Sequence, residues 1–311
     1  MNLCSVLLTL LLGGFAVLGL RGAPIKHEFV AIDEGLGTLL HVDENNPAKN
    51  WIVPAGQQLP RDLQLIGGGW ILLGHDTGFS EFELVTGKLR KEVARYKGVT
   101  SARRLANGHT LLVGVNLDGS TGVVLLEVDD SSVIKKTVLP GTYVRLARET
   151  SAGTFLLMSD TMIREVTRDG AAVHEWTVPD FRHAWKAVRL PDGHTLASAG
   201  YNPFLVELDD RGAVVRKIGA KSEALAFAKP NFYAMFQLLP NDDIVVTNWQ
   251  GHGPGHGASG VQLLQFDRSG AVVWQWSDAK IISSLQGVLV LDGLDPSVLH
   301  DERSGVMAPI R

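Results

Sequence analysis

The feature of this sequence that most restricts its fold is a short phrase that recurs along the chain. Residues 189–196 read RLPDGHTL, and residues 104–111 read RLANGHTL. Weaker copies begin at Gln64, Arg148 and Gln237. In the two strongest copies Asp-Gly or Asn-Gly separates two apolar runs, as in a tight hairpin whose turn residues adopt positive φ values. The chain is therefore expected to repeat one small β unit several times.

A second hairpin follows each copy of the first. Its turns are separated by 44, 39 and 42 residues, at Gly87, Ser131, Gly170 and Gly212. The gap before this series, from Asn46, is 41 residues, and the gap after it, to Gly270, is 58. A period near 40 with four strands per unit is typical of propeller blades rather than of helical solenoids. The turns predict six units, each with strands A to D in chain order.

The first unit lacks its strand A. Residues 29–33, 37–42 and 51–53 supply only strands B, C and D, whereas residues 284–293 align with strand A of the fifth and sixth units. The sequence therefore predicts an all-β, six-bladed β-propeller with four antiparallel strands per blade. Its ring is closed by a C-terminal strand that completes the first blade, which removes an open sheet edge. The longest gap also contains residues 222–229, which are expected to form a short helix that ends before Pro230.

The first residues differ in composition from the rest of the chain. Leu3 to Leu20 is almost wholly apolar, and its length suits the core of a signal peptide or a short membrane helix. Residues 1–23 are expected to be a signal peptide, with an uncleaved N-terminal anchor as the alternative. The protein is then exported, to the periplasm or out of the cell. The propeller is assigned to residues 24–293, and residues 294–311 form a C-terminal tail without an assigned element.

Charge and cysteine content exclude several classes of function. The chain has 29 basic and 33 acidic residues, for a net charge of −4, and no basic stripe, so nucleic acid is not an expected partner. Membrane contact is expected only through residues 3–20 if they are not cleaved. The only cysteine is Cys4, which excludes disulfides and thiolate sites from the propeller. A monomer without a resident metal or cofactor is expected.

One face of the propeller should carry the site. D–A connections and B–C loops share one face, and loops on a rigid scaffold are where binding groups concentrate. His109 and His194 belong to A–B turns on the other face and are interpreted as turn structure. The candidate ligand-binding residues on the D–A and B–C side are His75, Asp76, Asn116, Trp185, Tyr201, Asn202, Asn231, Tyr233, Asn248 and Trp249. Their rings, amides and imidazoles suit a small polar or aromatic molecule or a carbohydrate.

Residues 251–257, with the sequence GHGPGHG, are the sharpest local anomaly. Their two histidines, His252 and His256, could ligate zinc or copper together with His75 or His183. They could equally transfer protons near neutral pH. A third possibility is a plain loop that contacts ligand or only turns the chain. The candidate catalytic residues are His183, His252 and His256.

Three stretches resemble a known family. Residues 189–200 (RLPDGHTLASAG), 205–219 (LVELDDRGAVVRKIG) and 263–276 (LLQFDRSGAVVWQW) look like blades of arylsulfotransferase-type and quinoprotein-like (PQQ-like) propellers. The resemblance covers nearly all of the chain after residue 23 and rests on blade-forming residues. It implies a catalytic histidine in a strand A. The nearest one in the fifth unit is His183.

The leading functional prediction is an exported ligand-binding or scaffold module with a pocket on the D–A and B–C face. The alternative is an arylsulfotransferase-like or lyase-like propeller enzyme that uses a histidine at the mouth of the central channel. No complete catalytic set can be assembled from the loops, which favours the first of these.

Overall fold

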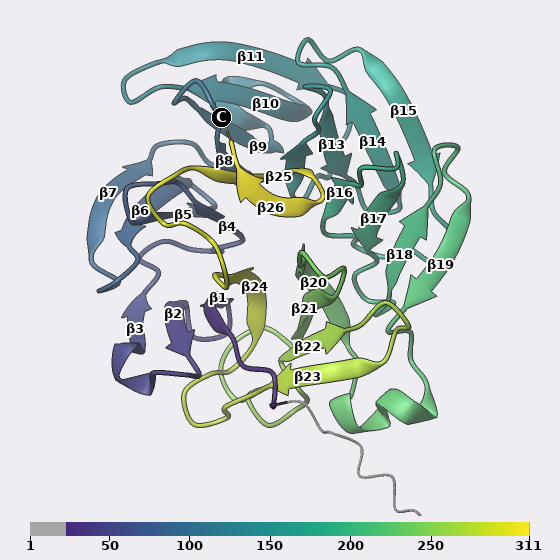
Figure 1. Cartoon of the computed structure of the whole chain (residues 1–311). Helices are drawn as coiled ribbons and strands as arrows, with labels where there is room; N and C mark the ends of the chain where they lie inside the picture. Colours follow the sequence, from purple (N-terminus) through teal and green to yellow (C-terminus); the bar gives the residue numbers. More distant parts are fainter. Residues whose placement is uncertain (1–22, 311) are drawn as a thin grey trace, which may run out of the picture.

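The computed structural model describes residues 23–310 and shows six antiparallel sheets around a central axis (Figure 1). Each blade has four antiparallel strands, with strand A next to the axis and strand D outermost, and the sheet of the sixth blade contains two further strands. The predicted six-bladed propeller is thereby confirmed. The expected signal peptide lies almost wholly outside the described residues. In the part that the structure describes, no helix is long and apolar enough to cross a membrane.

The strands follow the predicted order. The first three blades, from strand A to strand D, are β24 (Leu285–Val290), β1 (Glu28–Asp33), β2 (Thr38–Asp43) and β3 (Trp51–Pro54); β4 (Asp62–Leu65), β5 (Trp70–His75), β6 (Gly78–Glu83) and β7 (Leu89–Ala94); and β8 (Val99–Arg104), β9 (Thr110–Val115), β10 (Val123–Val128) and β11 (Val133–Leu139). The last three are β12 (Ala147–Glu149), β13 (Phe155–Met158), β14 (Met162–Val166) and β15 (Ala172–Thr177); β16 (Ala187–Arg189), β17 (Thr195–Ser198), β18 (Leu205–Leu208) and β19 (Val214–Ile218); and β20 (Phe232–Leu238), β21 (Ile244–Trp249), β22 (Leu263–Phe266) and β23 (Val272–Trp276).

The ring is closed as the sequence predicted. Strand β24 pairs antiparallel with β1, with Val30 opposite Leu289 and Phe29 opposite Val290. The side chain of Asp33 strengthens this junction, because its two carboxylate oxygens accept the backbone N–H groups of Ser283 and Ser284 at 2.6 and 3.0 Å. The first blade therefore joins the two ends of the chain.

Adjacent blades pack through the glycines of the C–D turns. Gly87 has a φ of +68°, and a Cβ there would lie 2.8 Å from the Trp51 ring of the preceding blade. Gly212, at φ +82°, would bring its Cβ to 2.2 Å from Trp176. These turns need glycine both for the positive φ and for the close approach of the neighbouring tryptophan. The periodic glycines of the sequence thus fix the spacing between blades.

The short helical segments lie in the connections. The expected helix at 222–229 is confirmed as a 3₁₀ helix, η3 (Glu223–Ala228), and two shorter ones are η1 (Pro47–Lys49) and η2 (Leu117–Gly119).

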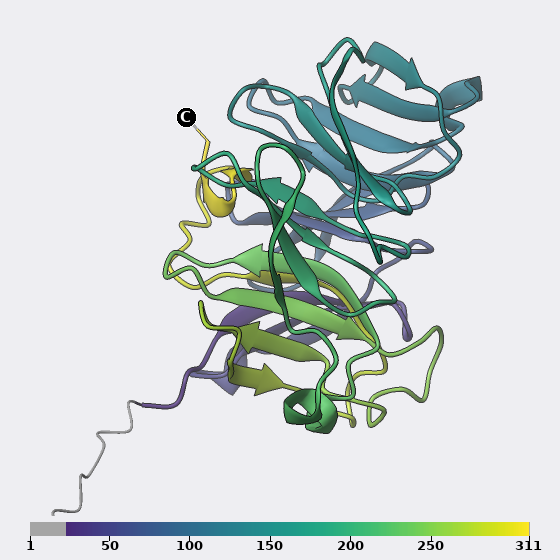
Figure 2. The ribbon, with the colours of Figure 1, turned by 90° about the vertical axis from the view of Figure 1, so that its right-hand side faces the viewer.

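The C-terminal tail contains a hairpin that the sequence did not predict. It consists of β25 (His300–Ser304) and β26 (Val306–Pro309), and β26 extends the sixth blade through one parallel bridge between Leu238 and Val306. Strand β25 lies against the inner strands β4, β12 and β16 of three other blades. The hairpin lies near the middle of the ring in Figure 1 and at one face in Figure 2, on the side of the A–B turns. It closes one end of the central channel.

Matched buried charges hold this hairpin in the channel. Glu302 accepts hydrogen bonds from Lys186 Nζ and from Arg148 Nε, the latter at 2.8 Å, and Arg148 Nη2 also donates to Asp62 at 2.8 Å. Arg103 and Asp301 form a further buried pair, so three cations face three carboxylates in this cluster. Burial opposes ionisation of Glu302, but the charges of Lys186 and Arg148 outweigh it and lower its pKa to about 2.

Candidate functional site

The opposite end of the channel, on the D–A and B–C face, is open. A cavity of about 180 Å³ lies there, with walls from loops and strand ends of five blades. We call it the channel-mouth cavity, and its lining residues are Glu34, Leu59, Arg61, Arg145, His183, Trp185, Tyr201, Phe232, Trp249, His252 and Gln286. Larger hollows of about 710 and 760 Å³ are open grooves over the outer strands and the A–B turns. The channel-mouth cavity is the place where aromatic and titratable side chains meet.

Aromatic rings form its walls in edge-to-face contacts. The ring centroid of Tyr201 lies 4.8 Å from that of Phe232 and 5.5 Å from that of His183. Phe232 in turn lies 5.6 Å from Trp185 and 5.5 Å from Trp249. Such contacts stabilise each other and leave little rotational freedom. The walls are therefore preformed apolar surfaces of the kind that line small-molecule sites.

Two histidines at the rim are each bonded through Nδ1. His252 Nδ1 lies 2.8 Å from Glu34 Oε1, and the other oxygen of Glu34 accepts the indole N–H of Trp249 at 3.1 Å. His183 Nδ1 lies 3.0 Å from the hydroxyl of Tyr143. The His252 side chain is 70 % exposed, so its ring is accessible from solvent. Both rings are held in fixed orientations at the entrance.

Two arginines in the cavity have no carboxylate partner. Among residues 23–310, neither Arg61 nor Arg145 forms an ion pair within 4.0 Å. The Arg145 guanidinium stacks 4.3 Å from the ring centroid of Tyr143 and 5.1 Å from that of Trp185. Burial and, secondarily, the positive charge of Arg145 lower the pKa of Arg61 to about 10. Asp76 and Glu34 oppose this decrease in the pKa of Arg61, but they only partly compensate it.

Three polar atoms in the cavity wall are buried without a hydrogen-bond partner among the described residues. They are Arg145 Nε, Trp185 Nε1 and Gln286 Oε1. An unpaired buried polar group costs roughly 1–3 kcal/mol, and native proteins contain few of them. Three of the seven such atoms found in residues 23–310 belong to side chains that line this one cavity.

The structure brings five predicted residues into the cavity lining: His183, Trp185, Tyr201, Trp249 and His252. The prediction omitted Glu34, Arg61, Arg145 and Gln286. Arg61 directly precedes β4, and Arg145 lies two residues before β12. Both arginines share one sequence signal: each is a charged residue just before an inner strand, on the D–A and B–C face. That signal would have identified them.

Most other predicted residues bond to neighbouring loops and lie outside the cavity lining. His75 is buried beside Ser80, with Nε2 3.2 Å from the hydroxyl. Asn248 accepts the N–H of Asn231 at 2.9 Å, and the hydroxyl of Tyr233 donates to the carbonyl of Gly219 at 3.0 Å.

The other four predicted residues also bond to loop groups and lie outside the cavity lining; they are Asp76, Asn116, Asn202 and His256. Asn116 Oδ1 accepts the N–H of Gly122, Asn202 donates to the carbonyl of Asp180, and the carbonyl of Asp76 accepts two N–H groups from residues 98–99. His256 Nε2 lies 3.2 Å from the carbonyl of His252, inside its own loop. These contacts shape the loops that carry the cavity.

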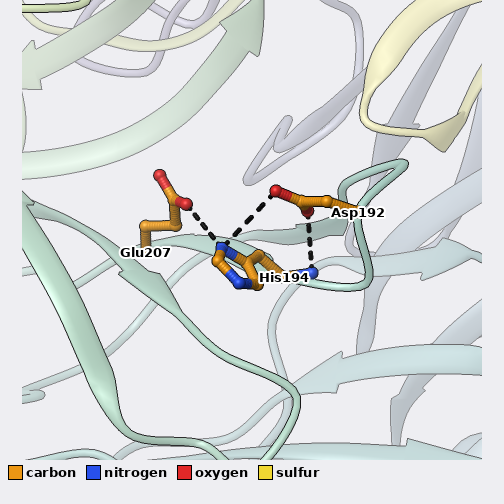
Figure 3. A group of neighbouring side chains, drawn as sticks. All are labelled: Asp192, His194 and Glu207. Atoms are coloured by element: carbon orange, nitrogen blue, oxygen red, sulfur yellow. Dashed lines mark hydrogen bonds and ion pairs between the residues drawn. The ribbon is translucent and has the colours of Figure 1, made fainter.

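A second cluster lies on the opposite face, in the repeated A–B turn (Figure 3). In residues 23–310, the only three potential metal ligands with donor atoms within 4.8 Å of one another are Asp192, His194 and Glu207. Neither histidine of residues 251–257 belongs to this cluster. His194 Nδ1 lies 2.7 Å from Glu207 Oε1, and this hydrogen bond raises the pKa of His194. Glu207 is also bonded to Arg216 Nε at 2.6 Å.

The third blade repeats this arrangement without the third ligand. His109 Nδ1 lies 2.7 Å from Glu127 Oε1, and Asn107 occupies the position of Asp192. A histidine–glutamate pair that recurs at the same turn of two blades fits the expected role in turn structure. The cluster of Figure 3 is therefore an ion pair that ties the A–B turn to strand C.

Comparison with known proteins establishes the fold class. A solved structure of a protein of unknown function from Bacteroides caccae is 19 % identical over 86 % of this chain and 99 % of its own, with a TM-score of 0.69. The WD40 propeller domain of Doa1 (15 % identity, 81 % and 79 % coverage, TM-score 0.56) and a streptogramin B lyase (11 %, 81 % and 83 %, 0.51) are also similar. At these identities the likeness shows the fold alone.

No family model and no curated protein matches the sequence. The arylsulfotransferase-type resemblance therefore stays a prediction, and the chain is a β-propeller whose structural neighbours include a WD40 domain, a streptogramin B lyase and a protein of unknown function.

Proposed function

We propose that this protein binds a small organic molecule in the channel-mouth cavity. The observation that supports this most directly is that Arg145, Trp185 and Gln286, each with a buried and unpaired polar atom, line one aromatic-walled cavity. A ligand with matching polar groups would satisfy them, whereas an empty apolar cavity would leave their cost uncompensated. The rigid rings supply contact area and the polar atoms supply orientation.

The volume limits the size of the ligand. An engineered protein cavity of about 150 Å³ accommodates benzene, so a cavity of about 180 Å³ suits one ring with one or two small substituents. A monosaccharide or a simple aromatic compound fits this limit, and an oligosaccharide would have to extend out of the mouth. The ligand class is thus a single-ring molecule.

The test is a binding screen with a set of single-ring compounds, followed by NMR spectroscopy of the tryptophan indole resonances. Ligands are expected to shift the Trp185 and Trp249 signals and to lose affinity at least about tenfold in Trp185→Leu. The matched control is Trp70→Leu, because Trp70 lies on the opposite face over a different groove. The proposal is wrong if no compound in the set perturbs the cavity tryptophans.

A catalytic role is the second candidate, and the paired histidines support it. His183 and His252 line the same cavity, and Tyr143 and Glu34 respectively fix their Nδ1 atoms. A histidine oriented by a carboxylate is a common general base, and one protein of similar fold is named a lyase. Chromatography of the bound compound after incubation separates the two roles. A binder returns it unchanged, whereas an enzyme converts it and loses that activity in His252→Ala.

We also propose that residues 1–23 direct export. The support is the apolar run from Leu3 to Leu20. Mass spectrometry of the protein recovered outside the cytoplasm would show whether the mature chain starts near residue 24. A full-length chain found only in the cytoplasm would contradict the proposal.

A further inference from the structure

We infer that the channel-mouth cavity selects a single-ring carboxylate, held by Arg61 and Arg145, over its neutral analogues. This inference rests on the proposed function and adds the chemical class of the ligand.

The first argument is charge balance. At the closed end of the same channel, buried cations are matched by carboxylates: Arg103 by Asp301, and Lys186 and Arg148 by Glu302. At the open end, Arg61 and Arg145 have no carboxylate within 4.0 Å in the part of the chain described by the structure. Glu34 is the carboxylate in the cavity lining, and its two oxygens are bonded to His252 and Trp249. Asp76 and Glu34 act on Arg61 only from a longer distance, so the place of a direct ion-pair partner is left for the ligand.

The second argument is the geometry of the unpaired donors. The Arg145 guanidinium stacks on Tyr143 and Trp185, and its nitrogens form no hydrogen bond with any residue in the range 23–310. A carboxylate accepts up to four hydrogen bonds and matches the planar guanidinium fork. One carboxylate group can thus satisfy donors that no protein atom satisfies. Neutral amides and alcohols offer fewer acceptor sites and no charge.

The third argument is the unpaired acceptor. Gln286 Oε1 is buried in the same wall and requires a donor. A carboxylate has no hydrogen to give, so the ligand needs a second group such as a hydroxyl. The cavity volume of about 180 Å³ leaves room for a ring between the two groups. A hydroxybenzoate has all three elements and serves as the probe.

The experiment is isothermal titration of the intact protein with 4-hydroxybenzoate and with 4-hydroxybenzamide, which differs only in the charged group. Hydrogen bonds to charged groups are stronger than those between neutral groups. The difference corresponds to about 10- to 100-fold in Kd, so we expect the carboxylate to bind about 10- to 100-fold more tightly than the amide. High salt should reduce its affinity more than that of the amide.

The variants assign the preference to the arginines. Arg61→Met is expected to bring the two dissociation constants within about threefold of each other, and Arg61→Lys is expected to retain most of the difference. Arg90→Met is the control, because Arg90 stacks on Trp70, 4.3 Å from its ring centroid, as Arg145 stacks on Trp185, but lies on the opposite face. Circular dichroism of each variant verifies the fold. If Arg61→Met unfolds, Arg145→Met carries the test and is likewise expected to bring the two dissociation constants within about threefold of each other.

The outcomes separate the inference from the proposed function. Equal affinities for acid and amide, or tighter binding of the amide, overturn the carboxylate inference and leave the cavity as a ligand site. The same conclusion follows if the single-ring screen yields only neutral ligands in the cavity. If neither probe binds and no compound of the screen perturbs Trp185, the inference and the proposed function fail together.

Discussion

The two ends of the central channel differ in whether their buried cations have carboxylate partners. At the closed end, Glu302 and Asp301 of the C-terminal hairpin each meet a buried cation. At the open end, Arg61 and Arg145 meet no carboxylate, and Gln286 has an unpaired oxygen. The closed end therefore contributes to stability, whereas the open end is the place where we propose that a ligand binds. Such unpaired groups commonly cost stability where a site is needed.

The largest effect is expected at Glu302, the residue on which the closed end depends. Glu302→Ala leaves Lys186 and Arg148 buried with less compensating charge, which should lower the free energy of unfolding by about 3–5 kcal/mol. Urea denaturation measures this change. Lys91→Ala, which removes an ion pair with the exposed Asp130, is the control and should have no measurable effect. A loss below about 1 kcal/mol for Glu302→Ala would show that the two ends do not differ in this way.

The next largest effect is expected in the pH dependence of the free energy of unfolding. The pKa of Glu302 is lowered from its ordinary 4.5 to about 2 in the folded protein. Its stabilising contribution is therefore fully present above pH 4.5 and is lost as the pH falls towards 2, by an amount on the order of 3 kcal/mol. Denaturation curves at pH 6, 4 and 3 should show this loss in the native sequence. In Glu302→Gln this component should be absent, and equal slopes for both proteins would contradict the assignment.

Two glutamines in inner strands provide the most direct comparison of the ends. At the closed end, Gln64 donates to the carbonyl of His300 at 2.8 Å and accepts the N–H of Arg104 at 2.6 Å. Gln64→Leu should therefore cost about 1–3 kcal/mol of stability. Gln286→Leu, at the open end, removes an unpaired oxygen and should leave the free energy of unfolding unchanged or raise it. The comparison fails if the two variants are destabilised equally in thermal or urea denaturation.

The smallest effect concerns the turn histidines. The hydrogen bond that His194 donates to Glu207 raises the pKa of His194 above 6.5. Protonated His194 therefore strengthens the turn at low pH, and this contribution is lost as the pH rises through its folded pKa. An NMR titration should show that pKa falling in Glu207→Gln, without a measurable change in denaturation. A specific response of His194 to Zn²⁺ would contradict the ion-pair interpretation of Figure 3.

The fold was predictable because its information is local and repeated. The Asp-Gly and Asn-Gly turns set the register of the blades, and that register exposed the missing strand of the first blade and located it at 284–293. The hairpin at 300–309 was not predictable in the same way, since it occurs once and has no copy to align. Its residues Asp301 and Glu302 are typical of an exposed tail, and only their partners in other blades bury them.

The sequence predicted which face of the propeller carries the candidate site and predicted part of the cavity lining. The rule that D–A and B–C loops share one face placed His183, Tyr201 and His252 together at the mouth. The same rule also selected Asn248 and His75, because a polar loop residue that satisfies neighbouring backbone has the same sequence signature as one that meets a ligand. The arginines of the cavity were missed since their importance depends on the absence of carboxylate neighbours, which only the folded chain reveals.

The pairing of β24 with β1 has a consequence for synthesis on the ribosome. Because the first blade takes its inner strand from residues 285–290, the N-terminal hairpin must wait for almost the whole chain before its inner edge is covered. Blades two to five consist of consecutive hairpins and can form as they emerge, since their contacts are short-range. The nascent chain is therefore an open arc with exposed strand edges until its last residues leave the ribosome. A stop codon near residue 284 should be far more damaging than one that removes an equal length of an ordinary tail.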